Sequence, residues 1–354
     1  MATIRDVARG SKVSIATVSR VFNESALVSE ATRHKVIAVA TRLGYWPNGI
    51  ARSLITNRTH ALGVLMPDLS GEFFSEVIHG MDLASRERGF HLLVSRSSSN
   101  ADELTAAVRS VHGRVEGLIV MAPDFDAGPA IRPWAGKVPT VLINPGHATD
   151  ATDSVSIANA EGAHLVVRHL LGLGHRSIAI ITGPAFYFDS LQRREGYREA
   201  LREAGIEPAP ELELAGDFSE HSGYAAAERM LRLPVRPTAV FASNDYMAVG
   251  ALGALHDAGV RVPEDIAMAG FDDIPLAHYI NPALTSVRVD IPELGRRAVQ
   301  LLLEPRPGPG AGVARHETLP TTLVVRSSCG AGPRNGGAPR GTRSPESPAP
   351  PARR

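Results

Sequence analysis

A change in hydrophobic spacing near residue 60 most constrains what this chain can fold into. Residues 1–58 carry a short three-helix pattern, whereas from Ala61 onward apolar runs alternate with longer amphipathic stretches. Short helices build a bundle and alternating strands and helices build a layered α/β fold. The sequence therefore predicts a small helical head joined to a larger α/β body, with the junction as the segment through which one could act on the other.

Charge divides the chain at the same place. Residues 1–58 hold nine Lys or Arg and three Asp or Glu, a net charge of +6, and residues 331–354 hold five Arg and one Glu, a net of +4. The whole chain sums to +0, so residues 59–330 carry −10. A basic head on an acidic body is typical of a nucleic-acid binder. A solvated basic face without a partner would give the same count.

Length and composition exclude several classes of protein. The chain has 354 residues, 44% of them hydrophobic, which is enough for a large core and two or three domains. No apolar run approaches the ~18 residues of a membrane span, and Thr3–Asp6 is too polar for a signal peptide. The single cysteine, Cys329, cannot form an intrachain disulfide or a thiolate metal cluster. We expect a cytoplasmic protein with no membrane partner, metal or cofactor.

Hydroxyl side chains mark three helix starts in the head. Thr3 precedes a carboxylate at the spacing of a capping box, and the turn Gly10–Lys12 ends that first helix. Ser14 begins a second helix through about Asn23, and Ser29 begins a third that Gly44 ends. The residues expected to face inward are Ile4, Val7, Ala8, Val18, Val21, Phe22, Val36, Ala40 and Leu43.

Two short helices joined by a tight turn and braced by a third form a helix-turn-helix, whose second helix fits the DNA major groove. Arg20 is the candidate for a bidentate contact to guanine. The other residues expected on this surface are Ile15 and Ala16, which offer only apolar contact, and Ser14, Thr17 and Ser19, which can bond to phosphates. A plain three-helix bundle with an exposed arginine is the alternative.

The head resembles the lactose-repressor/galactose-repressor (LacI/GalR) family of regulators. The resemblance rests on many positions at fixed spacing, namely Ile4–Ala8, Val13–Asn23, Val28–Arg33, Leu43–Tyr45, Pro47-Asn48 and Ala51–Leu54. It implies a hinge helix from Asn48 to about Thr56, ordered when two subunits lie side by side on an operator. It also implies DNA contacts from Asn48, Ala51, Arg52 and Leu54, with Leu54 as an apolar wedge in the minor groove. An isolated helix of this length is only marginally stable in water, so small changes in free energy can shift it between the helical and the unfolded state.

Some positions depart from the family pattern. Lys12 stands where the family usually has glycine, so a residue with a Cβ is expected to take a positive φ. Gly49 weakens the expected hinge helix. Gly71-Glu72 replaces the usual Asn-Pro, and Ala158-Asn159 replaces the usual Asp-Asn, so we assign Ala158-Asn159 no binding role.

The body is expected to fold as two doubly wound parallel sheets covered by helices, because its apolar runs are short and continuous. The predicted strands are 61–66, 90–95, 117–121, 141–143, 177–182, 239–242 and 266–271. The predicted helices are 73–88, 160–171, 191–204, 245–258 and 292–303, and 321–326 is expected to return to the second subdomain.

The resemblance spans about residues 1–329 and implies two subdomains of the periplasmic-binding-protein type with an effector in the cleft. It places chain crossings near 157–160, 287–291 and 317–321. The implied division is a helix-turn-helix domain at 1–46, a hinge and linker at 47–60, and an effector-binding and dimerisation domain at 61–329. In that domain the first subdomain takes 61–157 and 290–318, and the second takes 158–288 and 319–329. Residues 330–354, rich in Pro, Gly, Arg and Ser, are expected to be a disordered tail.

Residues at strand ends are the candidate effector ligands, because ligands of such sheets gather there. Arg193 and Asp272 can grip neighbouring hydroxyls, and aromatic rings can cover the apolar face of a sugar. The candidates are Phe73, Phe74, Asn144, Arg193, Phe218, Asn244 and Asp272. Phe73 and Phe74 would ordinarily be core residues, and Asn244 is equally suited to cap a helix.

These observations predict a transcriptional repressor that acts as a homodimer or as a tetramer, binds a palindromic operator and responds to a small effector. A sugar is the first expectation and a nucleoside or purine the second. A sugar-binding protein of a transport system is one alternative. An enzyme of Rossmann type is another, but the sequence has no G-x-G-x-x-G, P-loop, G-x-S-x-G or H-E-x-x-H motif.

Overall fold

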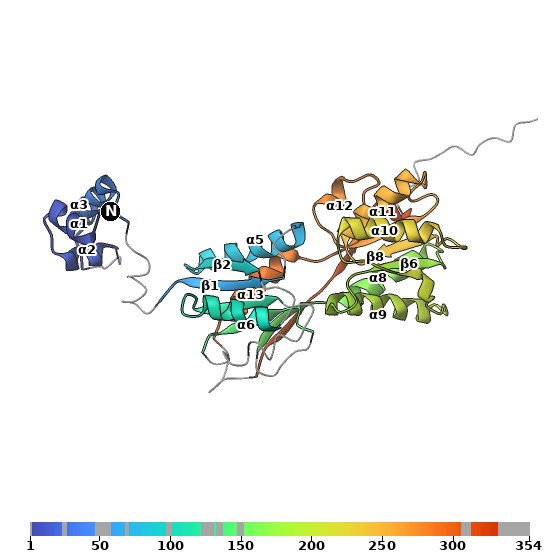
Figure 1. Cartoon of the computed structure of the whole chain (residues 1–354), viewed down its shortest axis with the longest axis horizontal. Helices are drawn as coiled ribbons and strands as arrows, with labels where there is room; N and C mark the ends of the chain where they lie inside the picture. The colour runs from blue at the N-terminus through green and yellow to red at the C-terminus, as the bar shows by residue number, and fades with distance from the viewer. Residues whose placement is uncertain are drawn as a thin grey trace, which may run out of the picture.

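The computed structural model describes residues 2–22, 27–46, 58–67, 71–96, 101–121, 131, 137–146, 152–305 and 313–331. Two α/β lobes lie side by side, and the helical head precedes them (Figure 1). The predicted hinge helix at 48–56 and nearly all of the predicted tail lie outside the described residues.

The head consists of α1 (Ile4–Ser11), α2 (Ile15–Phe22) and α3 (Glu30–Leu43). The Thr3 capping box is confirmed, because Thr3 and Asp6 satisfy each other's backbone N–H groups. Valine and alanine side chains from all three helices form a separate core, and Gly10 fits between α1 and α3, where a Cβ would lie 2.7 Å from Val39 Cγ1.

Three details of the head differ from expectation. The first helix continues through Ser11, so the turn begins only at Lys12, which has the expected positive φ of 53°. Ser29 occupies the N-cap of α3 but makes no side-chain capping bond, and its hydroxyl instead lies 2.9 Å from the Thr32 hydroxyl. Leu43 was predicted to face inward, but it lies at the last turn of α3 and is 39% exposed.

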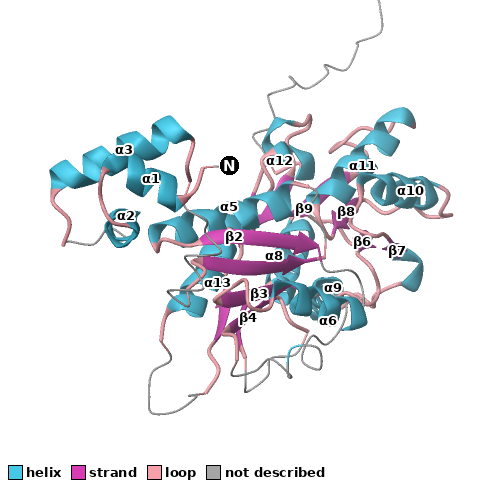
Figure 2. Ribbon diagram, turned by 60° about the vertical axis from the view of Figure 1, so that its left-hand side comes forward, coloured by secondary structure: helices cyan, strands magenta, loops and turns pink. Residues whose placement is uncertain are grey.

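Lobe one contains a six-stranded sheet in the order β11-β5-β4-β3-β1-β2. Its strands are β1 (Ala61–Met66), β2 (His91–Arg96), β3 (Gly117–Met121), β4 (Thr140–Ile143), β5 (Asp153–Ile157) and β11 (His316–Leu319), and its helices are α5 (Glu72–Glu87), α6 (Ala101–Val111) and α13 (Ile291–Leu303). Alternate residues of β1 face opposite sides, Leu62 toward the core that includes α5 and α13 and Leu65 toward the core that includes α6. The sheet is therefore covered on both faces, as Figure 2 shows.

Lobe two contains a second six-stranded sheet in the order β12-β10-β9-β8-β6-β7. Its strands are β6 (Ile178–Thr182), β7 (Glu213–Ala215), β8 (Ala239–Ala242), β9 (Ala267–Asp272), β10 (Thr285–Arg288) and β12 (Thr322–Val324). Its α-helices are α8 (Asn159–Gly172), α9 (Phe188–Glu203), α10 (Glu220–Leu231), α11 (Asp245–Asp257) and α12 (Leu276–Tyr279), and short 3₁₀ turns lie at Pro210–Leu212 and Ser327–Cys329. The edge strand β12 pairs antiparallel with β10, which the expectation of a purely parallel sheet missed.

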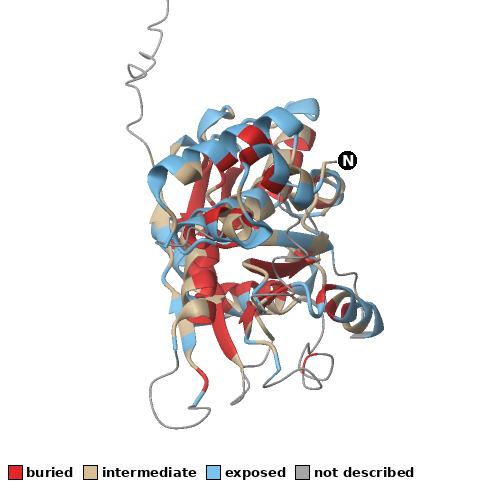
Figure 3. Cartoon of the chain, turned by 90° about the vertical axis from the view of Figure 1, so that its left-hand side faces the viewer, coloured by how far each residue is buried: buried red, intermediate tan, exposed pale blue. Residues whose placement is uncertain are grey.

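The buried residues gather in the strands and on the inner faces of the helices (Figure 3). The chain passes between the lobes after β5, after β10 and after β11. The first and third connections are hydrogen bonded to each other, because Ala158 N–H donates to Leu319 O at 3.0 Å. None of the described helices is long and apolar enough to cross a membrane.

Candidate functional site

The second helix of the head presents the predicted DNA-reading side chains on its outer surface. Ile15, Ala16 and Arg20 are exposed, and Ile15 is 46% exposed although it is apolar. Thr17 and Ser19 are half-buried beside them. Because Val18 and Val21 on the opposite side are buried in the head core, the exposed face has no role in packing the bundle.

Ser14 caps this helix. Its Oγ accepts a hydrogen bond from Thr17 N–H at 3.0 Å, and the Ser14 and Thr17 hydroxyls lie 2.9 Å apart. Hydroxyl groups at a helix N-terminus, where N–H groups point outward, suit contact with a phosphate. The remaining predicted DNA contacts, Asn48, Ala51, Arg52 and Leu54, lie outside the described residues.

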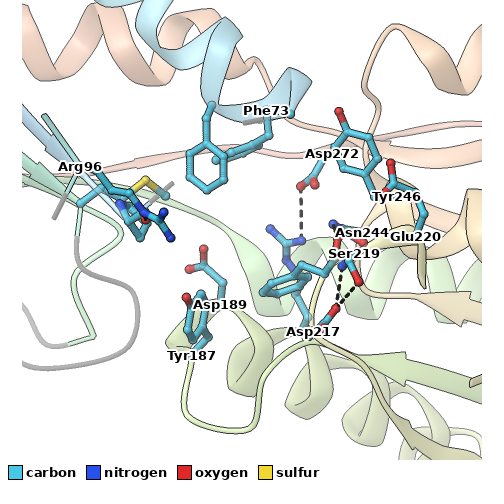
Figure 4. A pocket seen from close by; sticks show the side chains of 16 residues that line it. Phe73, Arg96, Tyr187, Asp189, Asp217, Ser219, Glu220, Asn244, Tyr246 and Asp272 are labelled. Atoms are coloured by element: carbon cyan, nitrogen blue, oxygen red, sulfur yellow. Dashed lines mark hydrogen bonds and ion pairs between the residues drawn. The ribbon is translucent and has the colours of Figure 1, made fainter. Parts of the chain in front are cut away.

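A cavity of about 580 Å³ lies between the two lobes (Figure 4). Both lobes line it with residues at or after the carboxyl ends of parallel strands, where ligands of such sheets gather. From lobe one the lining residues are Pro67, Gly71, Phe73, Phe74, Arg96 and Met121. From lobe two they are Tyr187, Asp189, Arg193, Asp217, Phe218, Ser219, Glu220, Asn244, Tyr246 and Asp272.

Arg193 is held rigidly at the base of this cavity. Its guanidinium carbon lies 3.8 Å from the centre of the Phe271 ring, and the residue is 3% exposed. Nε donates to Asn159 Oδ1 at 2.8 Å, and Nη1 donates to Ser243 O at 2.5 Å. No described residue accepts a hydrogen bond from Nη2. The Nη2 group of this fixed guanidinium can therefore donate hydrogen bonds to a ligand.

Asp272 forms an ion pair with that guanidinium, with 3.3 Å between its Oδ1 and Arg193 Nη1. Its backbone has a φ of 103°, a conformation that L residues rarely adopt and that is often found at ligand sites. The pKa of Asp272 is raised to about 6, chiefly by burial and to a lesser degree by nearby Asp189, against the lowering effect of Arg193. A buried carboxylate with spare lone pairs can accept hydrogen bonds from the hydroxyl groups of a ligand.

A second buried carboxylate, Asp189, lies at the start of α9 and connects the lobes. Asn144, from the end of β4 in lobe one, donates to Asp189 Oδ2 at 3.1 Å. Asn159, in the first connection, donates to Asp189 Oδ1 at 3.0 Å. Burial raises the pKa of Asp189, while Arg193 and these two amides lower it. Asn159, which we had given no binding role, thus holds both Arg193 and Asp189 in place.

Aromatic rings cover part of the cavity wall. Phe73 and Phe74 meet edge to face with ring centres 5.4 Å apart, and both are half-buried against the main core while also lining the cavity. Phe218, with a φ of 73°, lies opposite with its ring centre 6.0 Å from that of Tyr187. Such rings suit the apolar face of a sugar or of a planar base.

The structure brings six of the seven predicted effector ligands to the cavity. Asn244 lines it and also caps α11, since its Oδ1 accepts from Met247 N–H at 2.9 Å while its Nδ2 donates to Phe218 O. Asn144 is not among the lining residues. Its amide is occupied by Asp189 and by Ile157 N–H.

Sequence reasoning missed several cavity residues, namely Arg96, Tyr187, Asp189, Asp217, Ser219, Glu220 and Tyr246. Arg96 ends β2 one residue beyond the predicted strand, and Asp189 lies in the first turn of a helix that was predicted to begin only at Leu191. Correct element boundaries would have exposed both as strand-end or helix-start residues.

Asp273 anchors the neighbouring backbone. Arg288 Nε lies 2.7 Å from Asp273 Oδ2, and Arg326 Nη1 lies 2.6 Å from Asp273 Oδ1. Val289 N–H, in the second connection between the lobes, donates to Asp272 O at 3.3 Å. The end of β9, which presents Asp272, is therefore bonded directly to the second connection between the lobes.

The cavity thus offers a fixed guanidinium, a buried carboxylate and aromatic walls, a set suited to binding a polar, hydroxyl-bearing molecule. Among the described residues, no group of three His, Cys, Asp or Glu side chains is placed to hold a metal ion.

Two family models match separate parts of the chain. Residues 3–48 match the family described as bacterial regulatory proteins, lacI family, and residues 167–329 match a periplasmic binding protein-like domain. The chain is 36% identical over 305 residues to the ribose operon repressor of Escherichia coli strain K12, covering 86% of this chain and 92% of that protein. It is 35% identical over 306 residues to the transcriptional repressor PurR of Photobacterium profundum, covering 86% of this chain and 92% of that protein.

Among solved structures, the chain is similar to the lac repressor dimer bound to operator and the anti-inducer ONPF. The TM-score is 0.81 with 32% sequence identity, and the match covers 93% of this chain and 99% of that one.

Proposed function

The chain belongs to the LacI family of bacterial regulatory proteins, and on that premise we propose how its head and its two lobes act together. It is a DNA-binding transcriptional repressor under the control of a small-molecule effector, and it acts as a dimer on operator DNA. A transport protein that only binds sugar is not favoured, because the chain carries a lacI-type head.

The assignment of parts follows the division of residues expected from the sequence. Residues 1–46 read the operator, 47–60 form the hinge, and 61–329 bind the effector and hold the dimer together. The exposed face of α2, with Arg20 as the base-reading side chain, supports the first role. The cavity between the lobes supports the last. A symmetric dimer implies a palindromic operator with two half-sites.

The effector is a sugar or another polyhydroxylated molecule, with a nucleoside or purine as the second candidate. The observation that carries this proposal is the buried Arg193–Asp272 pair, which offers guanidinium donors and a carboxylate acceptor side by side. Such a pair binds adjacent hydroxyls, and the Phe73 and Phe218 rings can cover the rest of the molecule. We assign the protein no catalytic activity and place its action in the cytoplasm, with the DNA.

Selection of bound sites from random duplex DNA tests the function directly. The full chain should enrich one symmetric site, and binding to it should weaken steeply with salt, because phosphate contacts release counterions. Repeating the selection with D-ribose, lactose or adenosine should change recovery of that site for at least one compound. Failure to enrich any symmetric site under all conditions would contradict the proposed function.

A further inference from the structure

The amino-terminal end of α5 in lobe one is bonded directly to lobe two. Glu72 N–H donates to Tyr246 Oη at 2.6 Å, and Glu72 Oε2 accepts from Leu276 N–H at 3.2 Å. Tyr246 lies in the first turn of α11 and Leu276 begins α12, so one residue of lobe one engages two helices of lobe two. We call Glu72, Tyr246 and Leu276 the Glu72 latch.

The local sequence is suited to this contact. Gly71 has a φ of 88°, and a Cβ at this position would lie 3.2 Å from Tyr246 Cε2, so glycine lets the tyrosine ring approach the backbone. Glu72 can donate its backbone N–H, which a proline at this position could not do. This is where the chain departs from the usual Asn-Pro of the family pattern, so the latch depends on residues that differ from that pattern.

The latch lies against the effector cavity. Gly71 and Tyr246 both line it, and Phe73 follows Glu72 directly, so the latch fixes the aromatic wall of lobe one relative to lobe two. Figure 4 shows Tyr246 next to Asp272 and Phe73 facing the same space from α5. Any motion that separates the lobes at this end must break both hydrogen bonds.

We propose that Glu72 is a positioning residue that holds the two lobes in the arrangement where Phe73 and the Arg193–Asp272 pair face one cavity. The inference rests on the proposed function, because it concerns how readily the effector site is assembled. One hydrogen bond within the chain shifts the equilibrium between closed and open lobes by about fivefold. Loss of one or both bonds of the Glu72 latch should therefore lower the ratio of closed to open chains by about fivefold to thirtyfold. Apparent effector affinity should fall with the fraction of closed chains.

Spin labels measure the lobe arrangement without an effector. Cysteines replace Arg88 at the end of α5 and the exposed Val235 in lobe two, while the native Cys329, 2% exposed, labels poorly and supplies the background. The labelled full chain is diluted with excess unlabelled chain of the same variant, so that the distances measured lie within one subunit. The parental chain should give one narrow distance distribution.

Four substitutions separate the latch from other effects. Glu72→Ala and Tyr246→Phe should each broaden the distribution and add a longer distance. Glu72→Gln retains an oxygen that can accept from Leu276 N–H and should stay close to the parental result. Glu87→Ala, an exposed glutamate at the other end of the same helix, should change nothing. Distributions identical to the parental one in both Glu72→Ala and Tyr246→Phe would overturn the proposal.

Failure of the latch and failure of the proposed function are distinguishable. The distance measurement uses no DNA and no effector, so it can fail while site selection still succeeds. Where site selection identifies D-ribose, lactose or adenosine as effective, calorimetric titration of that compound should show its affinity for Glu72→Ala lowered by the same factor as the fraction of closed chains in the distance measurement. Unchanged affinity in a variant with separated lobes would likewise overturn the positioning role.

Discussion

The carboxylate of Asp272 and the guanidinium of Arg193 lie 3.3 Å apart, both almost completely buried, on the wall of a cavity between two lobes. Arg193 is fixed by Phe271, Asn159 and Ser243, whereas Asp272 is the last residue of β9 and has a rare backbone conformation. Two opposite charges held this way form a preorganised binding pair, because little side-chain entropy remains to be lost when a ligand binds.

Asp272→Ala should abolish the response to effector while operator binding is retained. Removing the carboxylate takes away the acceptor for ligand hydroxyls, but it leaves the head unchanged. Fluorescence anisotropy with labelled operator, titrated with the effective compound, measures both properties. Asp265→Ala is the matched control, since that carboxylate pairs with Arg261 on the surface. A normal effector response in Asp272→Ala would refute the assigned site.

Effector binding should weaken as the pH falls through about 6. The pKa of Asp272 is raised to about 6 by burial, so below that value the carboxyl becomes protonated, loses its ion pair with Arg193 and accepts ligand hydroxyls less well. Affinity should fall by at most about tenfold per pH unit, and it should be level above pH 7. Calorimetric titration from pH 5 to pH 8 measures this.

The same carboxyl binds its proton more tightly in the folded chain, so its contribution to folding stability should become less favourable as pH rises from about 4 to about 6.

Asn159→Ala should both destabilise the protein and weaken effector binding. The amide accepts from Arg193 Nε and donates to Asp189, so its loss leaves two buried charged groups short of partners. The expected cost is roughly 1–3 kcal/mol in the free energy of unfolding, measured by urea denaturation. Asn159→Asp tests the two contacts separately. It keeps an oxygen that accepts from Arg193, but it replaces the amide that donates to Asp189 with a second carboxylate. A variant of parental stability and parental effector affinity would show that the amide positions nothing.

Arg20→Ala should relax base preference at one position of each half-site and cost roughly 1–3 kcal/mol at its guanine. The exposed side chain on the outer face of α2 is the only described arginine within that helix. Binding to a set of operators changed one base pair at a time measures the preference. An unaltered preference profile would exclude base reading by Arg20, while uniform weakening at all sequences would indicate a phosphate contact instead.

Lys12→Gly should stabilise the head. Lys12 takes a φ of 53° at the carboxyl end of α1, where glycine lacks the steric penalty of a Cβ. The expected gain is about 0.5–1 kcal/mol, observed by thermal unfolding followed by circular dichroism. Lys35→Gly, inside α3, should be destabilising by a similar amount, and gains or losses of the same sign in both variants would contradict the explanation.

Local signals predicted much of the fold. The capping residues Thr3 and Ser14 and the apolar strand Ala61–Met66 each follow from neighbours in the sequence, whereas the left-handed Lys12 was expected from the resemblance to the family. Strand β5 was missed because it contains Asp153 and Ser154, which read as a surface segment. Both are buried, and their partners are Arg315 and His316, 162 residues away in the chain.

The candidate site, too, could be predicted only in part from the sequence. Residues at the ends of apolar strands, such as Asp272 and Asn244, could be proposed from the alternation of strands and helices. Asp189 accepts hydrogen bonds from Asn144 and Asn159, and these three side chains meet only when both lobes are assembled. The importance of Asp189 and Asn159 could therefore not be predicted from the order of strands and helices. The roles proposed for these residues in binding remain predictions for the experiments above.

The hydrogen bond between Ala158 and Leu319, with the bond from Val289 to Asp272, limits how the body can deform. Because the first and third connections are bonded to each other, they must move together when the lobes rotate against one another. A substitution that removes this bond should therefore change the axis about which the lobes rotate. A change of axis would redirect the two heads of a dimer on DNA even where the effector binds as before.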